Sequence, residues 1–244
     1  MEEQQRLQKY ISECGIMSRR AAEEEILKGH FTVNGETAQL GCKVVPKKDT
    51  VLYRGREIKS EKSRDIYIML NKPRGYVTTL SDEKGRHIVT ELTRDIEERI
   101  YPVGRLDMDS EGLLILTNDG ELTNILTHPG HEVGKVYHVK VDSEIDSDTL
   151  KKFRMPMQID GYDLKPVDVE IITRKNGYTM LRMELFEGRN RQIRKMCESL
   201  GLNVLSLVRI SIGPISLGNL PTGKWRYLTK SQVQSLKRGY KNVD

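Results

Sequence analysis

Two short apolar runs constrain the fold of this chain more than any other feature. Residues 66–70 read IYIML and residues 113–117 read LLILT, and each run is followed by turn-forming residues, NKPRG and NDG respectively. Apolar runs of this length between turn signals are typical of buried strands. They predict two strands in the interior of a sheet-containing domain.

The surrounding sequence predicts how this domain is built. Residues 135–141 alternate so that Tyr137, Val139 and Val141 share one face of a strand. Residues 167–173 and 178–186 also fit strands, and a short helix is expected after residue 120. Because strands and short helices interleave without a regular βαβ order, we expect an α+β fold with a mostly antiparallel sheet.

The first sixty residues predict a smaller helix–hairpin module. Residues 5–28 fit two short helices, with Ser18 as the N-cap of the second and Gly29 as its end. A strand expected at residues 31–33 runs into an Asn-Gly pair, which is a strong signal for a hairpin turn, and another strand fits residues 50–53.

A charged stretch without apolar side chains, SEKSRD at residues 60–65, separates the two patterns. Such stretches are typical of linkers. We therefore expect a small module at residues 1–60, a linker at residues 61–65 and a larger domain at residues 66–244.

The charge distribution favours a polyanionic partner. The 244 residues include 40 Lys and Arg against 35 Asp and Glu, with an isoelectric point near 9.0. Residues 184–244 alone hold 11 basic and 4 acidic side chains. A basic third on a nearly balanced chain suggests nucleic acid, although an ordinary solvated surface remains an alternative.

Several classes of protein are disfavoured. No apolar run approaches the roughly 20 residues needed to span a bilayer, and the acidic, polar start predicts no signal peptide. The three cysteines, Cys14, Cys42 and Cys197, are far apart, so neither a disulfide scaffold nor a zinc site is expected. The sequence predicts a reduced, cytoplasmic protein that does not associate with a membrane.

The segment GRLDMDSEG at residues 104–112 has three interpretations. The first is an ordinary turn, since Asp side chains bind nearby backbone amides. The second is a calcium loop, since Asp107, Asp109, Glu111 and Gly112 match the start of an EF-hand loop, although position twelve is Asn118 and no helix pair flanks it. The third is a catalytic carboxylate beside a glycine turn that leaves room for a substrate.

A second segment, EGRNRQIRKM at residues 187–196, predicts a basic helix that Asn190 caps. Arg191, Arg194 and Lys195 then share the side opposite the apolar face. Three cations at this spacing repel one another by tenths of a kcal/mol per pair. A solvated helix face tolerates that cost, and an anionic partner would turn it into a gain.

In the N-terminal module, the segments RLQKYI, SRRAA and VNG follow one another in this order. They resemble the RNA-binding module named after the fourth small-subunit ribosomal protein, here called the S-four-like module, and the resemblance covers roughly residues 5–59. It implies docking on structured RNA and no chemistry of its own. The phosphate contacts that it implies are Arg6, Lys9, Arg19, Arg20 and Lys28. Taken without the resemblance, Arg19 and Arg20 fit an ordinary pair of solvated arginines at the start of a helix.

Six motifs of the larger domain occur in this order: NKPRG, GRLDMDSEGLL, LTNDG, HP, KVY and GRNRQIRKM. In this order they closely resemble the bacterial ribosomal-RNA pseudouridine synthases of the RsuA/RluB/RluF type. With the S-four-like module, which this family also carries, the resemblance spans nearly the whole chain. Two departures are mild, since Ser110 stands where Thr is frequent and Gly134 where a larger residue is common.

The resemblance implies the chemistry. These enzymes break the N1–C1′ bond of a uridine, turn the base and rejoin it through C5, without cofactor or metal. It implies that Asp107 is the catalytic carboxylate, acting as a nucleophile or as a base at C2′. Arg194 is expected to pair with Asp107, and Tyr137 to stack on the flipped base and assist proton transfer from C5. Core packing remains the alternative for Tyr137.

The remaining expectations concern RNA contacts and partners. Arg105, Arg189, Arg191 and Lys195 are expected to contact RNA, whereas Asp109 either orients Arg105 or caps the turn. The expected partner is ribosomal RNA, large-subunit before small-subunit, or a ribosome assembly intermediate, and the protein is expected to be a monomer. The alternatives are the same chemistry on a tRNA and a non-catalytic RNA-binding or ribosome-assembly protein.

Overall fold

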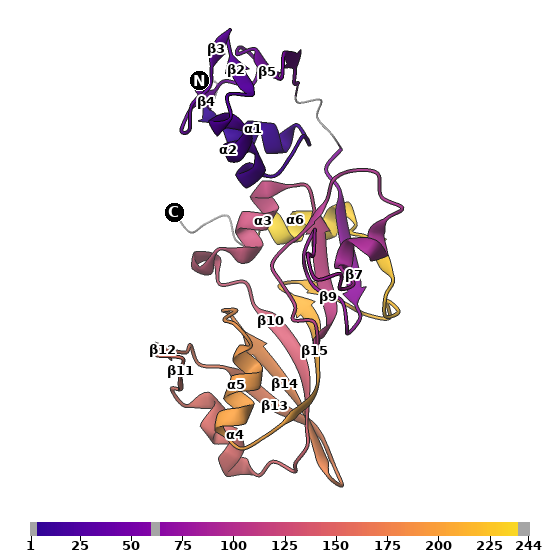
Figure 1. Ribbon diagram of the computed structural model, residues 1–244. Coiled ribbons are helices and arrows are strands. Elements are labelled where there is room, and N and C mark those ends of the chain that lie inside the picture. The colour runs from indigo at the N-terminus through magenta and orange to yellow at the C-terminus, as the bar shows by residue number, and fades with distance from the viewer. Residues whose placement is uncertain (1–3, 60–63, 239–244) are drawn as a thin grey trace. The chain divides into compact units, whose positions relative to one another are not determined.

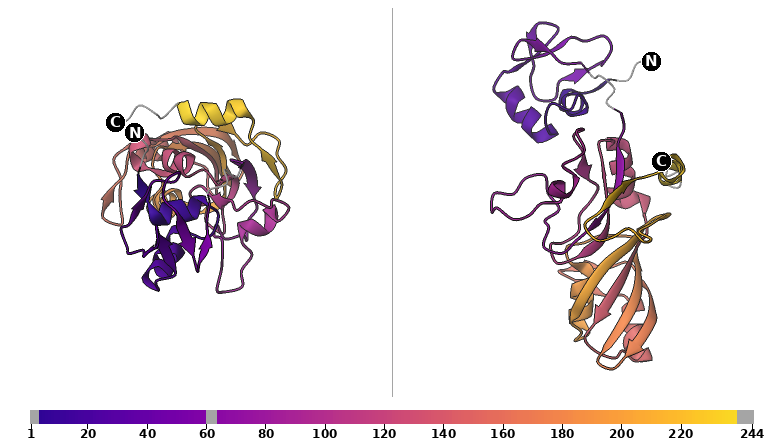
Figure 2. Two further views of the ribbon diagram at one scale, coloured as in Figure 1. Left: turned by 90° about the horizontal axis from the view of Figure 1, so that it is seen from above. Right: turned by 90° about the vertical axis from the view of Figure 1, so that its right-hand side faces the viewer.

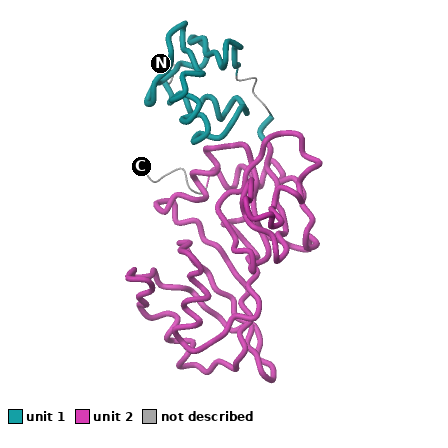
Figure 3. Tube along the Cα trace, in the orientation of Figure 1, with its two compact units in different colours: residues 1–65 teal, residues 66–244 magenta. Residues whose placement is uncertain are grey.

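The computed structural model describes residues 4–59 and 64–238 (Figure 1). The chain divides into two compact units, residues 1–65 and 66–244 (Figure 3). The boundary follows the stretch for which the sequence predicts a linker, of which residues 61–63 lie outside the described residues.

The first unit contains the predicted helix pair and hairpins. Helices α1 (Leu7–Glu13) and α2 (Arg19–Leu27) precede a sheet with the order β3-β2-β5-β6. Its strands are β2 (Phe31–Val33), β3 (Glu36–Thr37), β5 (Val51–Tyr53) and β6 (Arg56–Glu57), and β1 (Gln5–Arg6) pairs with β4 (Lys43–Val44). The Ser18 hydroxyl accepts a hydrogen bond from the Ala21 amide at 3.2 Å, which confirms the predicted cap.

The second unit is built on one large sheet. Its path is β13-β14-β10-β15-β9-β7-β17, with β16 paired to β15 and β8 to β9. The strands are β7 (Tyr67–Lys72), β8 (Tyr101–Pro102), β9 (Glu111–Thr117), β10 (Lys135–Val141), β13 (Asp168–Lys175), β14 (Tyr178–Leu185), β15 (Val204–Ile212), β16 (Ile215–Ser216) and β17 (Trp225–Tyr227). Within this sheet only β9 and β15 pair in parallel, which confirms the predicted α+β class with a mostly antiparallel sheet.

The helical segments and a small hairpin complete this unit. They are η1 (Val89–Thr93), α3 (Gly120–Thr127), η2 (Pro129–His131), α4 (Ser147–Arg154), the hairpin of β11 (Gln158–Ile159) and β12 (Tyr162–Asp163), α5 (Gln192–Ser199) and α6 (Lys230–Arg238). Figures 1 and 2 show the twist of the sheet, with α4 and α5 beside β13 and β14. Phe153 of α4 and Ile193 of α5 belong to one core cluster with Val169 and Leu181 of those strands.

The two apolar runs are buried on both faces. Met69, Leu113 and Ile115 pack with α3 and α6 in one cluster, whereas Leu70 and Leu114 pack with η1 in another. A strand covered on both sides needs apolar side chains at successive positions, which explains why the runs are continuous rather than alternating. Among the described residues, no helix is long and apolar enough to cross a bilayer.

The close approach of β9 to β15 places the loop that precedes β9. Gly112 has φ +104° and lies opposite Arg209 in the parallel register. A Cβ atom at this glycine would lie 2.3 Å from the Arg209 carbonyl oxygen. The absence of a side chain at residue 112 therefore lets β15 approach the start of β9, directly after the segment that contains Asp107.

Candidate active site

A cleft of about 630 Å³ lies where the loop before β9, strand β10 and the start of α5 meet. Its wall includes five residues that the sequence singles out: Arg105, Asp107, Tyr137, Arg189 and Arg191. They come from three segments far apart in the chain, so the fold assembles a single site from the separate motifs. The volume is within the range of pockets that hold small molecules.

Lys72 anchors the Asp107 loop from inside the protein. Its side chain is fully buried at the end of β7, and its Nζ donates to the carbonyl oxygens of Pro73 at 3.0 Å, Asp107 at 3.0 Å and Ser110 at 2.8 Å. Burial lowers the pKa of this lysine to about 8. Three carbonyl acceptors satisfy the three N–H donors of the ammonium group, so the loop backbone and the buried lysine hold each other in place.

Two further groups fix the same loop. Arg209 is 3% exposed, and it donates from Nε to the Leu113 carbonyl at 2.7 Å and from Nη1 to the Arg105 carbonyl at 3.4 Å. The Thr78 hydroxyl donates to the Leu106 carbonyl at 2.7 Å and accepts from the Leu106 amide at 3.2 Å. The backbone is therefore tied on both sides of Asp107, which is what a positioned catalytic side chain requires.

The cations around Asp107 differ from those expected. The Asp107 carboxylate, with its side chain 30% exposed, lies 3.8 Å from Arg191 Nη1. Arg194 instead donates to the Asp109 backbone carbonyl at 3.1 Å and lies 3.3 Å from the Asp109 carboxylate. Among the ion pairs of the described residues, Asp107 pairs with Arg191 and not with Arg194, so the expected pair of Arg194 with Asp107 is wrong.

The backbone at the start of α5 explains this difference. Arg191 occupies the N-cap position with φ 52° and ψ 31°, in the left-handed region, and no side chain caps the helix. The predicted capping by Asn190 is therefore also wrong. Because Arg191 is the cap residue, it does not follow the residue spacing of the helix, and its guanidinium reaches both Asp107 and Asp109. Arg194 lies inside α5, about one helical turn further along the chain.

Asp109 links the two arginines rather than orienting Arg105. Its carboxylate accepts from Arg191 Nη1 at 3.2 Å and pairs with Arg194. Burial lowers the pKa of Arg194, and the neighbouring Asp109 charge opposes that shift. An arginine remains charged under such shifts, so the loop carries two carboxylates and two guanidinium groups in one contiguous cluster.

Strand β10 contributes an aromatic ring and a lysine to the cleft. Tyr137 is half-buried and packs against two core clusters, those of the α5 side and of the η1 side, while also lining the cleft. Lys135 lines the cleft too, and burial lowers its pKa to about 8. Tyr137 thus serves as core and as cleft wall at once, which keeps its ring in a fixed position.

The other residues expected to contact RNA lie on α5 and in the first unit. Lys195 is on α5, where it forms an ion pair with Asp160. In the first unit, Arg19 and Arg20 open α2 and are exposed, and Arg6 is exposed at the start of α1. Lys9 lies 3.7 Å from Glu13, and Lys28 pairs with Glu25 at 2.8 Å.

The calcium interpretation does not fit the structure. Glu111 and Gly112 belong to strand β9, so the acidic segment does not form a twelve-residue loop between helices. In the described part of the chain, no three His, Cys, Asp or Glu side chains are grouped so that they could hold a metal ion.

Comparison with known proteins agrees with this fold. Residues 66–199 match the family described as RNA pseudouridylate synthase, and residues 5–51 match the S4 domain. The chain therefore belongs to the RNA pseudouridylate synthase family, and it is an isomerase that acts on uridine in RNA. The resemblance to the RsuA/RluB/RluF type and to the S-four-like module is confirmed.

Individual relatives span almost the whole chain. An uncharacterized RNA pseudouridine synthase of Aquifex aeolicus (strain VF5) is 42% identical over 95% of this chain and 93% of its own length. Ribosomal large subunit pseudouridine synthase B of Bacillus subtilis (strain 168) is 39% identical over 96% of each chain. A crystal structure of a pseudouridylate synthase superposes with a TM-score of 0.68 at 27% identity, covering 95% of this chain and 99% of that one.

The pKa of Lys72 predicts a pH-dependent contribution to stability. The folded-state value of about 8 lies below the roughly 10.4 of a lysine in an unfolded chain. Between these values the unfolded state binds more protons, so the contribution of Lys72 to the free energy of unfolding becomes more favourable as pH rises from about 8 towards 10. Lys72→Met removes this contribution.

Urea unfolding of the unchanged protein and of Lys72→Met, followed by Trp225 fluorescence at pH 7.5 and pH 10, tests this prediction. The difference in unfolding free energy between the two proteins should shift by about 2 kcal/mol in favour of the unchanged protein at the higher pH. An unchanged difference would show that Lys72 has an ordinary pKa and is not buried as described.

Proposed function

We propose that this protein converts a specific uridine of ribosomal RNA to pseudouridine, with Asp107 as the catalytic carboxylate. One observation carries the proposal: Asp107 lines a cleft shared with Tyr137, and its loop is held in place. Lys72 donates to the Asp107 carbonyl, and Arg209 donates to the Arg105 carbonyl in the same loop. The proposal places the reaction in the cytoplasm, on naked ribosomal RNA or an assembly intermediate, with the protein acting as a monomer.

The chemistry assigned to Asp107 requires its ionised form. As a nucleophile, the carboxylate bonds to C1′ as the N1–C1′ bond breaks, and C5 of the turned base later displaces it. As a base, it removes the C2′ proton and later returns it. In either course the proton on C5 is lost and one is gained on N1, so the product is an isomer. The positively charged Arg191 guanidinium lies 3.8 Å from this carboxylate.

The surrounding residues support the same role. Tyr137 presents a flat ring on which a uracil can stack, and Arg105 is exposed at the cleft where it can contact a phosphate. Arg194 acts through Asp109, by holding the carbonyl and carboxylate of the residue two positions after Asp107. Extraction of the uridine from its stack costs a few kcal/mol, which contacts with the RNA backbone can offset.

Large-subunit ribosomal RNA is the first choice of substrate. The relative in Bacillus subtilis that is 39% identical over 96% of this chain is named for the large subunit. The basic segment at residues 188–196 and the ending LGNLPTGKW at residues 217–225 also look most like that branch.

Pseudouridine mapping identifies the substrate. Unmodified transcripts of both ribosomal RNAs and of tRNAs from the source organism are incubated with the protein, then labelled with carbodiimide and read by primer extension. We expect one new stop in the large-subunit RNA. A stop only in small-subunit RNA or tRNA would move the assignment there, and no stop on these RNAs or on ribosome assembly intermediates would overturn the proposal.

The proposed RNA contacts of the first unit predict a change in salt dependence. Each phosphate contact adds roughly 0.7–0.9 to the slope of log Kd against log salt concentration. Arg19→Ala with Arg20→Ala should therefore reduce this slope by about 1.5, with kcat unchanged at saturating RNA. Filter binding from 50 to 300 mM salt measures it, and Lys230→Ala, which changes an exposed cation on α6, is the matched control. Equal slopes for all proteins would show that Arg19 and Arg20 do not contact RNA phosphates.

A further inference from the structure

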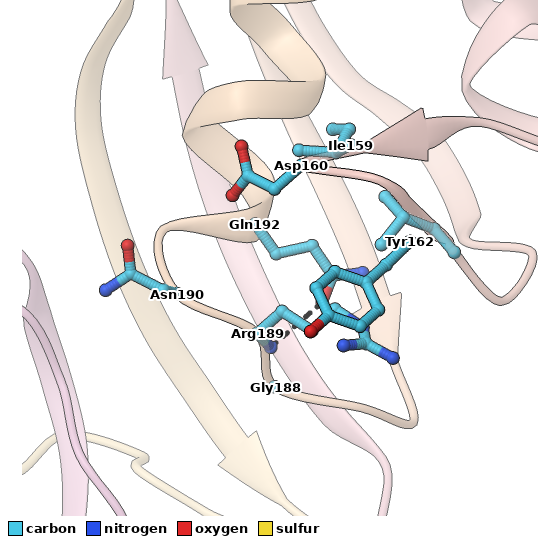
Figure 4. Close-up of a pocket in the computed structure, with 8 residues that line it drawn as sticks. Ile159, Asp160, Tyr162, Gly188, Arg189, Asn190 and Gln192 are labelled. Atoms are coloured by element: carbon cyan, nitrogen blue, oxygen red, sulfur yellow. Dashed lines mark hydrogen bonds between the residues drawn. The ribbon is translucent and has the colours of Figure 1, made fainter.

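A second hollow, of about 330 Å³, adjoins the cleft. It lies between the β11–β12 hairpin and the segment from Gly188 to Gln192 (Figure 4). Gly188, Arg189, Asn190 and Gln192 line both the hollow and the cleft, so the two share a wall. A molecule that fills the cleft and continues past this wall would enter the hollow.

Tyr162 contributes an aromatic side chain to the wall of this hollow. Its side chain is 55% exposed, and it belongs to none of the core clusters of the described residues, although Ile159 and Leu164 on either side pack into the core. The Arg189 guanidinium lies over its ring, 4.2 Å from the ring centre, and Figure 4 shows Asn190 pointing away from both. An exposed aromatic side chain without a packing role is available for a ligand.

The hairpin that carries Tyr162 is held in place. Asp160 and Gly161 form its turn with φ values of 53° and 77°, and Asp160 forms an ion pair with Lys195 of α5. On the other wall, the Arg189 amide donates to Gln192 Oε1 at 3.1 Å. The hairpin that carries Tyr162 and the backbone of Arg189 are thus both tied to α5, which holds the two sides of the stack together.

The charges around the hollow suit a nucleotide. Its acidic residue, Asp160, is neutralised by Lys195, and the nearby Glu187 accepts from Gln192 at 2.9 Å and lies 3.6 Å from Arg189. The guanidinium-bearing residue Arg189 lies on the wall shared with the cleft, and Arg191 lines the cleft beside it. Single-stranded RNA is recognised by bases stacked on aromatic rings or guanidinium planes, with cations on the phosphates.

We propose that this hollow, the Tyr162–Arg189 subsite, binds the base of a nucleotide that flanks the target uridine on the same RNA strand. The base stacks on the Tyr162–Arg189 pair while the uridine occupies the cleft. The inference rests on the proposed function, because it takes the cleft as the position of the target. It assigns to the β11–β12 hairpin a part in choosing the sequence around the modified site.

Steady-state kinetics and binding on one RNA test the subsite. The probe is the large-subunit ribosomal RNA transcript labelled with [5-³H]uridine. Tyr162→Ala should raise KM about tenfold and weaken filter binding of the same transcript by the same factor, as expected for loss of one stacked base, with kcat unchanged. Tyr162→Phe keeps the ring and should restore both values. Tyr227→Ala removes a tyrosine that is 54% exposed elsewhere and should change neither.

A synthetic stem-loop that contains the mapped uridine then identifies the bound base. Abasic residues are placed singly at the three positions on either side, and the effect of Tyr162→Ala on Kd should vanish at one of them only. An unchanged Kd for Tyr162→Ala on the transcript, or the same loss on every abasic RNA, would overturn the subsite. If the protein modified no RNA but Tyr162→Ala still weakened binding tenfold, the proposed function would fail and the RNA-binding subsite would stand.

Discussion

Asp107→Asn is expected to abolish pseudouridine formation, with a loss of at least about 10⁴-fold in kcat. The amide has nearly the same shape as the carboxylate, but it neither attacks C1′ nor accepts a proton from C2′. The backbone contacts of Lys72 and Arg209 do not involve this side chain, so the loop should keep its conformation. RNA binding should therefore stay within about threefold, since a single exposed contact contributes little.

Asp109→Asn is the matched control for this prediction. It changes the same functional group two residues away, in the same loop, and weakens the ion pairs with Arg191 and Arg194. We expect a loss of about 10- to 100-fold, because the cations around Asp107 become less well fixed. Single-turnover kinetics at saturating RNA measure both variants. A dead Asp109→Asn beside an active Asp107→Asn would assign the catalytic role to Asp109.

Gly112→Ala is expected to have the largest effect on stability. The new methyl group would lie 2.3 Å from the Arg209 carbonyl oxygen and 2.7 Å from the Arg209 amide nitrogen, and both are backbone atoms that cannot rotate away. The residue would also have to adopt φ +104°. Separation of β9 from β15 would relieve the clash, but it would disturb the sheet at its centre. We expect a loss of at least about 3 kcal/mol in the unfolding free energy.

Gly177→Ala separates backbone strain from the clash. Gly177 has φ +83° in the β13–β14 turn, and a Cβ atom there would meet nothing within 4 Å. This variant should lose only about 1 kcal/mol. Urea unfolding followed by the fluorescence of Trp225, the only tryptophan, reports on the unit that contains both glycines. Equal losses for the two variants would mean that β9 and β15 do not approach as closely as described.

Local patterns predicted much of the fold. The apolar runs, the alternation at residues 135–141, the Ser18 cap and the Asn34-Gly35 turn depend on neighbouring residues, and the structure confirms them. The parallel pairing of β9 with β15 was not predictable in this way. It joins segments almost a hundred residues apart, and no local periodicity marks it.

The sequence predicted which residues line the candidate site better than it predicted which of them contact one another. The motifs pointed to Asp107, Tyr137, Arg105 and Arg191, and the structure brings all four to one cleft. The expected partner of Asp107 was wrong because the left-handed conformation of Arg191 decides which arginine faces the carboxylate. Neither Lys72 nor Arg209 was identified as a functional residue.

These two cations could have been suspected only from their positions. Lys72 is the last residue of a strand whose other residues are almost all apolar, and Arg209 lies within an apolar strand. A charged residue in such a strand needs partners inside the protein. Which backbone carbonyls supply them depends on how the Asp107 loop folds over the sheet, and that follows from tertiary packing rather than from spacing along the sequence.

Release of tritium from RNA tests the central claim most directly. Formation of the new bond at C5 expels the hydrogen that this carbon carried, so a [5-³H]uridine transcript should release one tritium per modified site into water. We predict stoichiometric release by the unchanged protein and none above background by Asp107→Asn at equal RNA binding. Absence of release from every ribosomal RNA, assembly intermediate and tRNA, or undiminished release by Asp107→Asn, would contradict the account.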